Sequence, residues 1–266
     1  MILASLVFLS ESKLQFGEVG ERMKKINLII YPFLLLAYLL SAPLLAQSED
    51  ERDIVSKFQS GQATGMKVTI LLAGANGSLT AVDPKREFSP GEEIKVALES
   101  NMRGYVYLVN FGSSGKNSVV FPDARAGESH LIQPYRQYII PSSYPIGFNE
   151  HTGTEIFRIF ISRRKVAFLE AAVYERDGLL TEADSKAFAG MSNDSARQRP
   201  GVVATEMNLT DNPASSRTVG TRDPIWNDGK KTSLVVIRRP KGQSDKLQPG
   251  EIAVVRINFK NKGEAK

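Results

Sequence analysis

Residues 104–122 read GYVYLVNFGSSGKNSVVFP, and this stretch decides the fold class of the 266-residue chain. Its first half places apolar and aromatic side chains on both faces of an extended segment, with Tyr105, Tyr107, Val109 and Phe111 on one face and Val106 and Leu108 on the other. Apolar side chains on both faces are typical of a strand with protein above and below it. Residues 112–117 have the glycine-serine composition of a hairpin loop. The stretch therefore predicts a central β-hairpin that lies between two layers of sheet.

Further strands are indicated on both sides of this hairpin, where apolar residues alternate or cluster between turn-forming residues. They are expected at residues 66–73, 78–82, 94–98, 135–140, 154–162, 234–239 and 252–259. Asn76-Gly77 joins the first two, because this pair accepts positive φ at both centres of a type I′ turn. The last two strands are expected to pair with each other. The pattern predicts a mainly β fold, either an antiparallel β-sandwich or an open barrel, of Ig-like type.

Helical periodicity is confined to short segments. Residues 49–62 carry Ile54, Val55 and Phe58 at the spacing of one short amphipathic helix, although a loose leader is an equal alternative. Residues 166–173 and 182–189 are compatible with helix, and residues 191–231 are predicted to form a long polar surface insertion.

These segments predict one domain after a leader. The expected organisation is a leader at residues 47–64, a single β-sandwich domain at 65–260 with a helical and loop insertion at 166–231, and a charged tail at 261–266.

The N-terminal region has the pattern of a secretory signal peptide. Lys24-Lys25 precede residues 26–46, INLIIYPFLLLAYLLSAPLLA, which carry no charge and are followed by polar and acidic residues. We expect residues 23–46 to be the signal peptide and residues 1–22 to be an upstream extension. The alternative is an uncleaved anchor, because the uncharged run is long enough to cross a bilayer of about 30 Å. Both interpretations predict export to the periplasm, the cell surface or the medium.

The composition excludes several classes of site. The formal net charge of +5 is modest and dispersed, which argues against a nucleic-acid partner. Cysteine is absent, so a disulfide framework, a thiol nucleophile and a thiolate metal site are excluded. The sequence contains no G-x-S-x-G elbow and no glycine-rich phosphate-binding motif, so neither a serine hydrolase nor a nucleotide site is indicated. No cofactor is expected.

Histidines and acids supply few candidates for chemistry. The two histidines, His130 and His151, lack the paired spacing of a metal site and are expected in exposed loops. Glu150 and Glu155 are the acid pair to consider for glycoside hydrolysis. For Glu155 the alternative is a cap on the loop before its strand. No catalytic set is indicated, and we expect a protein that is not an enzyme.

Tyrosines and basic residues suggest binding surfaces. Tyr135, Tyr138 and Tyr144 invite a carbohydrate- or peptide-binding role, since aromatic rims give rigid contact area, but packing along strand edges is the favoured explanation. Together with Glu150, His151 and Glu155 they form the set of candidate ligand or partner contacts. The basic clusters, such as residues 163–165, are expected to be solvated strand ends.

The order of these motifs resembles the bacterial domain of unknown function family 4384 over about residues 81–168. The elements that carry the resemblance are Phe88, Gly91-Glu92, Gly104-Tyr105-Val106-Tyr107, Val120-Phe121-Pro122 and Gly153-Thr154-Glu155. The resemblance implies an exported or envelope-associated accessory or sensing module, and it implies no catalytic residue, because none is established for that family.

The expected function is an exported accessory binding or protein-interaction module of the bacterial cell envelope. A protein or a glycan of the envelope is the expected partner, and membrane contact is expected only through an uncleaved signal segment. One alternative is a glycan-active enzyme or carbohydrate-binding protein of the periplasm or cell surface. Another is a structural role in which the C-terminal hairpin pairs its edge with a partner. The sequence leaves the oligomeric state open.

Overall fold

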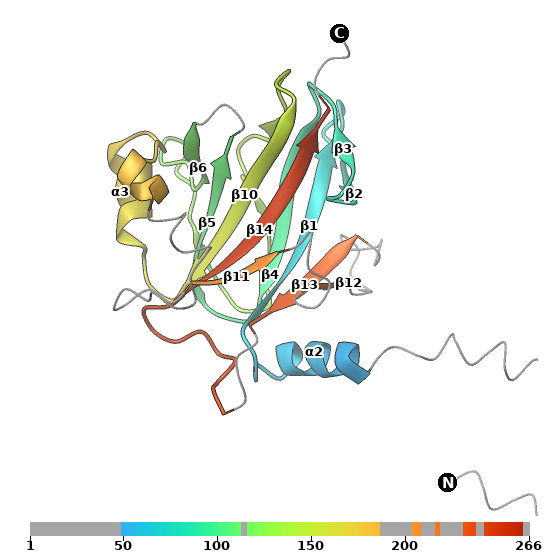
Figure 1. Ribbon diagram of the computed structural model, residues 1–266, viewed down its shortest axis with the longest axis vertical. Coiled ribbons are helices and arrows are strands. Elements are labelled where there is room, and N and C mark those ends of the chain that lie inside the picture. The colour runs from blue at the N-terminus through green and yellow to red at the C-terminus, as the bar shows by residue number, and fades with distance from the viewer. Residues whose placement is uncertain are drawn as a thin grey trace, which may run out of the picture. The chain divides into compact units, whose positions relative to one another are not determined.

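The computed structural model describes residues 49–112, 116–186, 204–208, 216–218, 231–237 and 242–262. Contacts divide the chain into Met1–Arg52 and Asp53–Lys266, and the fold described below is that of the second unit. The strands of this unit form two sheets of seven strands each, which confirms the predicted mainly β sandwich architecture (Figure 1).

The first sheet has the strand order β12-β13-β1-β4-β8, with β2 paired to β1 and β9 paired to β4. Its strands are β1 (Gly65–Ala73), β2 (Leu79–Val82), β4 (Glu93–Ser100), β8 (Gln137–Ile140), β9 (Ile146–Gly147), β12 (Ser216–Thr218) and β13 (Thr232–Val236). All of its pairings are antiparallel.

The second sheet has the strand order β11-β14-β10-β5-β6, with β3 paired to β14 and β7 paired to β5. Its strands are β3 (Glu87–Phe88), β5 (Gly104–Phe111), β6 (Asn117–Phe121), β7 (Leu131–Ile132), β10 (Gly153–Ser162), β11 (Ala204–Asn208) and β14 (Ile252–Asn261). Both β3 and β11 run parallel to β14, so the sheet is mixed and not purely antiparallel.

The predicted central hairpin is confirmed, because β5 pairs with β6 antiparallel from Leu108 opposite Phe121 to Phe111 opposite Asn117. The inward face of β5 carries Val106 and Leu108 into the main core between the sheets. The prediction of a second sheet over its other face was wrong. Helix α3 (Ala167–Glu175) packs there instead, and its buried residues form a second cluster with Tyr107 (Figure 1). An apolar strand face needs an apolar cover, and one side of a helix supplies it as well as a sheet does.

The predicted pairing of the two C-terminal strands was also wrong. β13 pairs with β1 in the first sheet, whereas β14 pairs with β10 in the second. The two strands therefore belong to opposite layers of the sandwich. In the described residues, β13 and β14 form no C-terminal hairpin that could offer its edge to a partner.

The hairpin of β1 and β2 is confirmed, but its turn is not type I′. Gly77 has φ 77°, and the positive-φ residues do not include Asn76. The Gly77 amide donates to the Gly74 carbonyl at 2.9 Å, which closes a four-residue turn before β2. A type I turn followed by a left-handed glycine fits this geometry, because only its last residue requires positive φ.

The leader and the insertion contain more regular structure than their composition indicates. Helix α2 (Glu49–Gln59) buries Ile54 and Phe58 against Leu234 and Val236 of β13. The polar insertion contributes the edge strands β11 and β12, which were not predicted because short edge strands need no apolar alternation. Residues 182–186 are helical, as expected for the start of 182–189.

Several predictions fall on residues outside the described ranges, namely the upstream extension at 1–22, the signal peptide at 23–46 and most of the charged tail. Within the described ranges, every helix is too short or too polar to cross a membrane.

Candidate functional site

The three candidate tyrosines lie on or beside strand β8 but do not form one aromatic rim. Tyr135 precedes the strand and is 50% exposed, Tyr138 lies within it and is half-buried, and Tyr144 follows it and is 42% exposed. The Tyr138 hydroxyl accepts a hydrogen bond from the Gln133 amide at 2.8 Å, so this ring is committed to the fold.

Tyr135 has an unusual backbone conformation for its side chain. Its φ is 57°, in the left-handed region that disfavours residues with bulky side chains. The Tyr135 amide donates to the Ser100 carbonyl at 2.7 Å, and the hydroxyl donates to the Gln59 carbonyl at 3.1 Å. The ring stands edge-on to Phe58 with its centroid 6.0 Å away. These contacts hold an exposed aromatic side chain in a conformation that costs about 1–3 kcal/mol in other proteins.

Strand β8 is an edge of the first sheet. In the described part of the chain it pairs with β4 alone, from Val96 opposite Ile140 to Glu99 opposite Gln137. At the edge of the other sheet, β6 is covered, because the Val119 amide donates to the Gly178 carbonyl at 2.8 Å. The residues of β8 are half-buried, apart from the buried Ile140. An edge strand presents backbone donors and acceptors to which another chain can pair.

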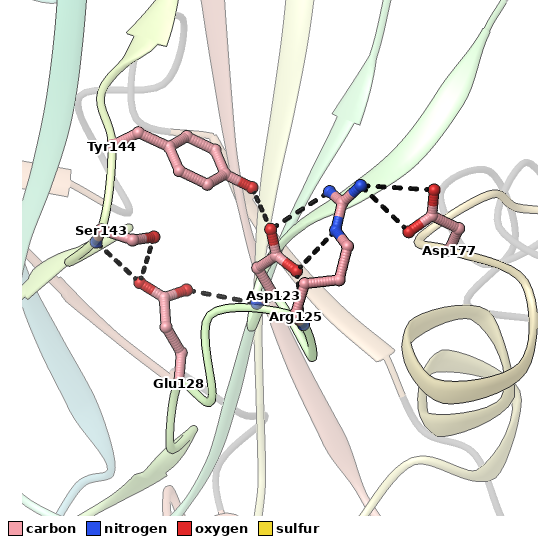
Figure 2. Close-up of polar contacts among 6 residues, drawn as sticks. All are labelled: Asp123, Arg125, Glu128, Ser143, Tyr144 and Asp177. Atoms are coloured by element: carbon pink, nitrogen blue, oxygen red, sulfur yellow. Dashed lines mark hydrogen bonds and ion pairs between the residues drawn. The ribbon is translucent and has the colours of Figure 1, made fainter.

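The loop after β6 carries an exposed polar network (Figure 2). The Tyr144 hydroxyl donates to the Asp123 carboxylate, which also accepts from Arg125 Nε and Nη2, each at 3.1 Å. Figure 2 shows the Arg125 guanidinium between Asp123 and Asp177, with its Nη1 3.2 Å from an Asp177 oxygen. Hydrogen bonds from Arg125, and then from Tyr144, hold the pKa of Asp123 well below its usual range.

Glu128 ties this loop to the end of β8. Its Oε1 accepts from the amide and the hydroxyl of Ser142 at 2.6 and 2.7 Å. It also accepts from the same two groups of Ser143, each at 3.0 Å (Figure 2). Burial opposes ionisation of Glu128, but these hydrogen bonds outweigh it and lower its pKa. The carboxylate is thus engaged within the fold, where it fixes the loop.

A second polar network lies under helix α3, and it shows that the prediction of an exposed His130 was wrong. His130 is buried, with its ring centroid 4.9 Å from that of Tyr107 and 5.2 Å from that of Tyr105. Glu170 Oε1 accepts from His130 Nε2 at 2.7 Å and from the Tyr107 hydroxyl at 2.6 Å. Lys165 donates to its Oε2 at 2.7 Å. His130 is buried because its carbonyl accepts from the Val106 amide at 2.9 Å, which draws the segment before β7 onto β5.

The pKa values of this network agree with a neutral histidine and an ionised carboxylate. Burial lowers the pKa of His130, although the Glu170 carboxylate opposes this shift. Burial acts to raise the pKa of Glu170, but the hydrogen bonds from Lys165, Tyr107 and His130 lower it overall. Burial, followed by the bond to Glu170, raises the pKa of Tyr107 far above its ordinary value. The network holds α3 to the second sheet, because Tyr107, His130 and Lys165 all donate to Glu170 of this helix.

The remaining candidates, Glu150, His151 and Glu155, differ in their exposure to solvent. Glu150 and His151 are exposed in the loop before β10, and the His151 amide donates to Asn149 Oδ1 at 3.0 Å. Glu155 is buried within β10 and lines a cavity of about 130 Å³ at one end of the sandwich. The lining residues include Asn149 and Glu155 but neither Glu150 nor His151. The acid pair therefore does not flank one cleft.

Sequence reasoning missed Asp123, Glu128 and Glu170 as the acids that organise polar contacts. Glu170 carried a usable signal, because it lies in a segment predicted to be helical and would project from the helix near Val166 and Val173. Its partners on β5 and before β7 are far away along the chain, so the spacing of residues gave no signal for the network. Among the described residues, no group of three histidines or acids is arranged to hold a metal ion.

Comparisons with known proteins found a match for one part of the chain only. No curated protein matches the sequence, and no solved structure matches the fold. Residues 87–165 match the model of one family, and this match lies inside the range that the motifs indicated and spans β3 to β10. The core of the sandwich, including the central hairpin and the strand that carries Glu155, thus resembles the family described as Domain of unknown function (DUF4384).

Proposed function

We propose that this protein is an exported accessory module of the bacterial cell envelope that binds another envelope protein through Tyr135 and edge strand β8. The observation that carries the proposal is Tyr135, an exposed ring held at positive φ beside an edge strand. Strained residues persist where the surrounding structure fixes them, and they cluster at binding sites.

Strand β8 supports the proposal in a second way. An extended segment of a partner gains main-chain hydrogen bonds when it adds to the open edge of a sheet, and side chains beside the edge supply selectivity. Tyr135 lies at the start of β8 and presents a large, rigid ring, the type of side chain that contributes most at protein interfaces.

Two features of the sequence support the envelope as the site of action. Residues 23–46 have the pattern of a signal peptide, and the resemblance of residues 87–165 to the family implies an exported or envelope-associated module. The absence of cysteine is compatible with either side of the membrane and adds nothing to this argument.

The test uses the full chain, tagged at its C-terminus and produced in its native cells. Cells are treated with formaldehyde, the envelope fraction is isolated, and the tagged chain is recovered with its cross-linked partner. Tyr135→Gly removes the ring while it relieves the positive φ, so its stability should stay within about 1 kcal/mol of the wild type. We expect the cross-linked species to be lost in this variant.

Tyr174→Ala is the matched control, because Tyr174 is also an exposed tyrosine but lies on α3, outside the second sheet. It should retain the cross-linked species. A cytosolic location of the tagged chain would refute the export part of the proposal. Equal recovery of the partner with Tyr135→Gly and Tyr174→Ala would refute the binding surface.

A further inference from the structure

Exposed basic side chains gather at the end of the sandwich where β10 ends and β14 begins (Figure 1). Arg163 and Arg164 follow directly after β10. Arg103 directly precedes β5, and Lys246 lies in the loop that leads into β14. The sequence predicted that residues 163–165 are solvated strand ends, but it gave no sign that Arg103 and Lys246 lie beside them.

Strand pairing brings these residues to one place. The last residue of β10 pairs with the second residue of β5 and with the first residue of β14. Arg163 therefore leaves the sheet beside the point at which Arg103 leads into it. Arg163 Nε donates to the Leu247 carbonyl at 2.8 Å, and this bond holds the loop of Lys246 against the end of β10.

The charge of these four residues is not neutralised nearby. Within the described part of the chain none of their side chains forms an ion pair. Lys165, by contrast, is 2.7 Å from an oxygen of Glu170. Asp245 and Glu251 lie near the four residues but are half-buried, and Glu251 Oε2 accepts from the Gln248 amide at 2.6 Å. This end of the domain thus exposes an excess of positive charge, which attracts an anionic partner.

The N-terminal segment indicates which anionic partner to expect. Both interpretations of the uncharged run at residues 26–46 bring the chain to a membrane. The chain then enters the domain at the basic end, because Phe58 packs against β13 and the Gly65 amide donates to Asn101 Oδ1 at 3.1 Å, two residues before Arg103. An uncleaved anchor would therefore tether the domain by this end.

We propose that Arg103, Arg163, Arg164 and Lys246 form a basic surface that contacts the anionic phospholipid headgroups of the membrane. Guanidinium groups donate paired hydrogen bonds to phosphate oxygens, and each basic side chain near an anionic bilayer strengthens the contact about fivefold. This contact adds to the one that the sequence predicts through an uncleaved signal segment. It rests on the proposed function only for the envelope location, because Tyr135 and β8 belong to the first sheet and are not part of the basic surface.

The test uses the full chain with one cysteine introduced by Gln248→Cys at an exposed position of the basic end, since the chain has no other cysteine. A fluorophore on this cysteine is mixed with vesicles of phosphatidylcholine alone, or with about 30% phosphatidylglycerol, that carry a quencher on a lipid headgroup. We expect quenching with phosphatidylglycerol that weakens as salt is raised from about 0.1 to 0.5 M, and little quenching without it. Equal quenching by the two vesicles would overturn the proposal.

The position of the fluorophore has its own control. Ala75→Cys carries it in the exposed turn after β1, at the opposite end of that strand from Gly65. This fluorophore should remain unquenched with both vesicles. Stronger quenching at Ala75→Cys than at Gln248→Cys would assign the contact to the other end of the domain and overturn the proposal.

Charge variants identify the residues that make the contact. Arg163→Gln combined with Arg164→Gln should lower the ratio of bound to free basic surface at least tenfold with phosphatidylglycerol. Lys85→Gln combined with Lys262→Gln is the matched control, because it removes the same charge at the opposite end, where β3 pairs with the end of β14. Equal losses from the two pairs would show that only net charge matters, which would overturn the proposal.

A second pair of substitutions covers the case in which loss of Arg163 disturbs the loop. Arg164→Gln combined with Lys246→Gln leaves the bond from Arg163 to Leu247 intact and should weaken the contact by a similar factor. Quenching that is unchanged in this variant would overturn the proposal.

Two further results separate this surface from the protein-binding one. Tyr135→Gly should leave the quenching unchanged even if it abolishes the cross-linked envelope protein. If phosphatidylglycerol gives no quenching but Arg163→Gln with Arg164→Gln abolishes the cross-linked protein, the lipid assignment is overturned and the basic surface belongs to the protein partner.

Discussion

Two tyrosines of this protein donate their hydroxyls to a carboxylate that also contacts a basic side chain, but they do so in opposite environments. Tyr107 donates to Glu170, which is paired with Lys165, and the tyrosine is 0% exposed under α3. Tyr144 donates to Asp123, which is paired with Arg125 (Figure 2). Here the tyrosine is 42% exposed and the Arg125 side chain 70% exposed, although the Asp123 side chain between them is only 10% exposed.

The difference between the two networks lies in what replaces a lost bond. On the loop, water can form a hydrogen bond with a polar group that has lost its partner, so an exposed hydrogen bond or ion pair contributes little to stability. Under α3 water is excluded, and a freed hydroxyl or imidazole keeps the cost of its desolvation. The same chemical groups therefore fix the position of a helix in one place and only order a loop in the other.

The largest effect is expected for Glu170→Ala, which leaves both the Tyr107 hydroxyl and His130 Nε2 without their acceptor. Loss of one member of a buried polar network destabilises proteins by about 3 kcal/mol. Urea denaturation of the full chain measures this loss of unfolding free energy. Glu175→Ala, an exposed acid near the end of the same helix, controls for helix propensity and should cost much less. Equal losses from the two variants would show that the network contributes nothing.

The matched pair Tyr107→Phe and Tyr144→Phe tests the comparison most directly. Tyr107→Phe removes the donor to Glu170 and the acceptor of the Val166 amide, and should cost about 2 kcal/mol. Tyr144→Phe should cost less than about 0.5 kcal/mol, as exposed substitutions do. Both losses of unfolding free energy are measured from the urea concentrations at the unfolding midpoints, provided that the dependence of that free energy on urea concentration is the same in the variants and the wild type. Similar costs for the two variants would contradict the distinction by burial.

A smaller effect is expected from pH, through His130. Its pKa in the folded chain lies below the ordinary value of about 6.5, so the unfolded chain binds the proton more readily. Stability should therefore fall as the pH drops below about 6.5, until the folded pKa is passed. For one proton, the free energy of unfolding changes by at most about 1.4 kcal/mol per pH unit.

His130→Gln should remove this slope between pH 7 and 5, while His151→Gln should retain it because His151 is exposed. The lowered pKa values of Glu170, Glu128 and Asp123 act at lower pH, where each carboxylate is protonated, and they add a separate loss there. A slope that persists in His130→Gln would assign the effect to other groups.

The smallest effect is expected for Arg125→Ala. The Arg125 side chain is 70% exposed, so water and salt reach its guanidinium in both ion pairs, although the Asp123 side chain is only 10% exposed and that of Asp177 is 67% exposed. We expect an unchanged urea midpoint at physiological ionic strength. A clear loss of stability, insensitive to added salt, would show that the exposed network contributes more than its environment implies.

The parts of the fold that were predicted from sequence are those set by alternation along one strand. The hairpin of β5 and β6, the hairpin of β1 and β2, and helix α3 all follow from patterns within about twenty residues. The partners of β13 and β14 were not predictable, because their apolar patterns fit either layer of the sandwich. Likewise an apolar face on β5 does not show whether a sheet or a helix covers it.

The candidate site was predicted less well than the fold. Tyr135 and Glu155 were singled out by residue type, but the positive φ of the first and the cavity around the second arise from contacts with distant strands. His130 was misplaced because a single histidine directly after the polar residues Glu128 and Ser129 gives no sign of burial. Its position depends on β5, to which it is joined by a single backbone hydrogen bond.

The sequence by itself determined the class of this protein, because the alternation of apolar side chains is a local property that fixes which segments are extended and which faces must be buried. It also determined that disulfides and thiol chemistry are excluded, since folding cannot supply a residue type, cysteine, that the chain lacks. Only the tertiary structure decided which strands pair, which helix covers β5 and that Asn110 and Glu155 line the same cavity. These depend on contacts between segments far apart in the chain, and the free energy of such contacts comes from the fit of whole faces, which no single stretch contains.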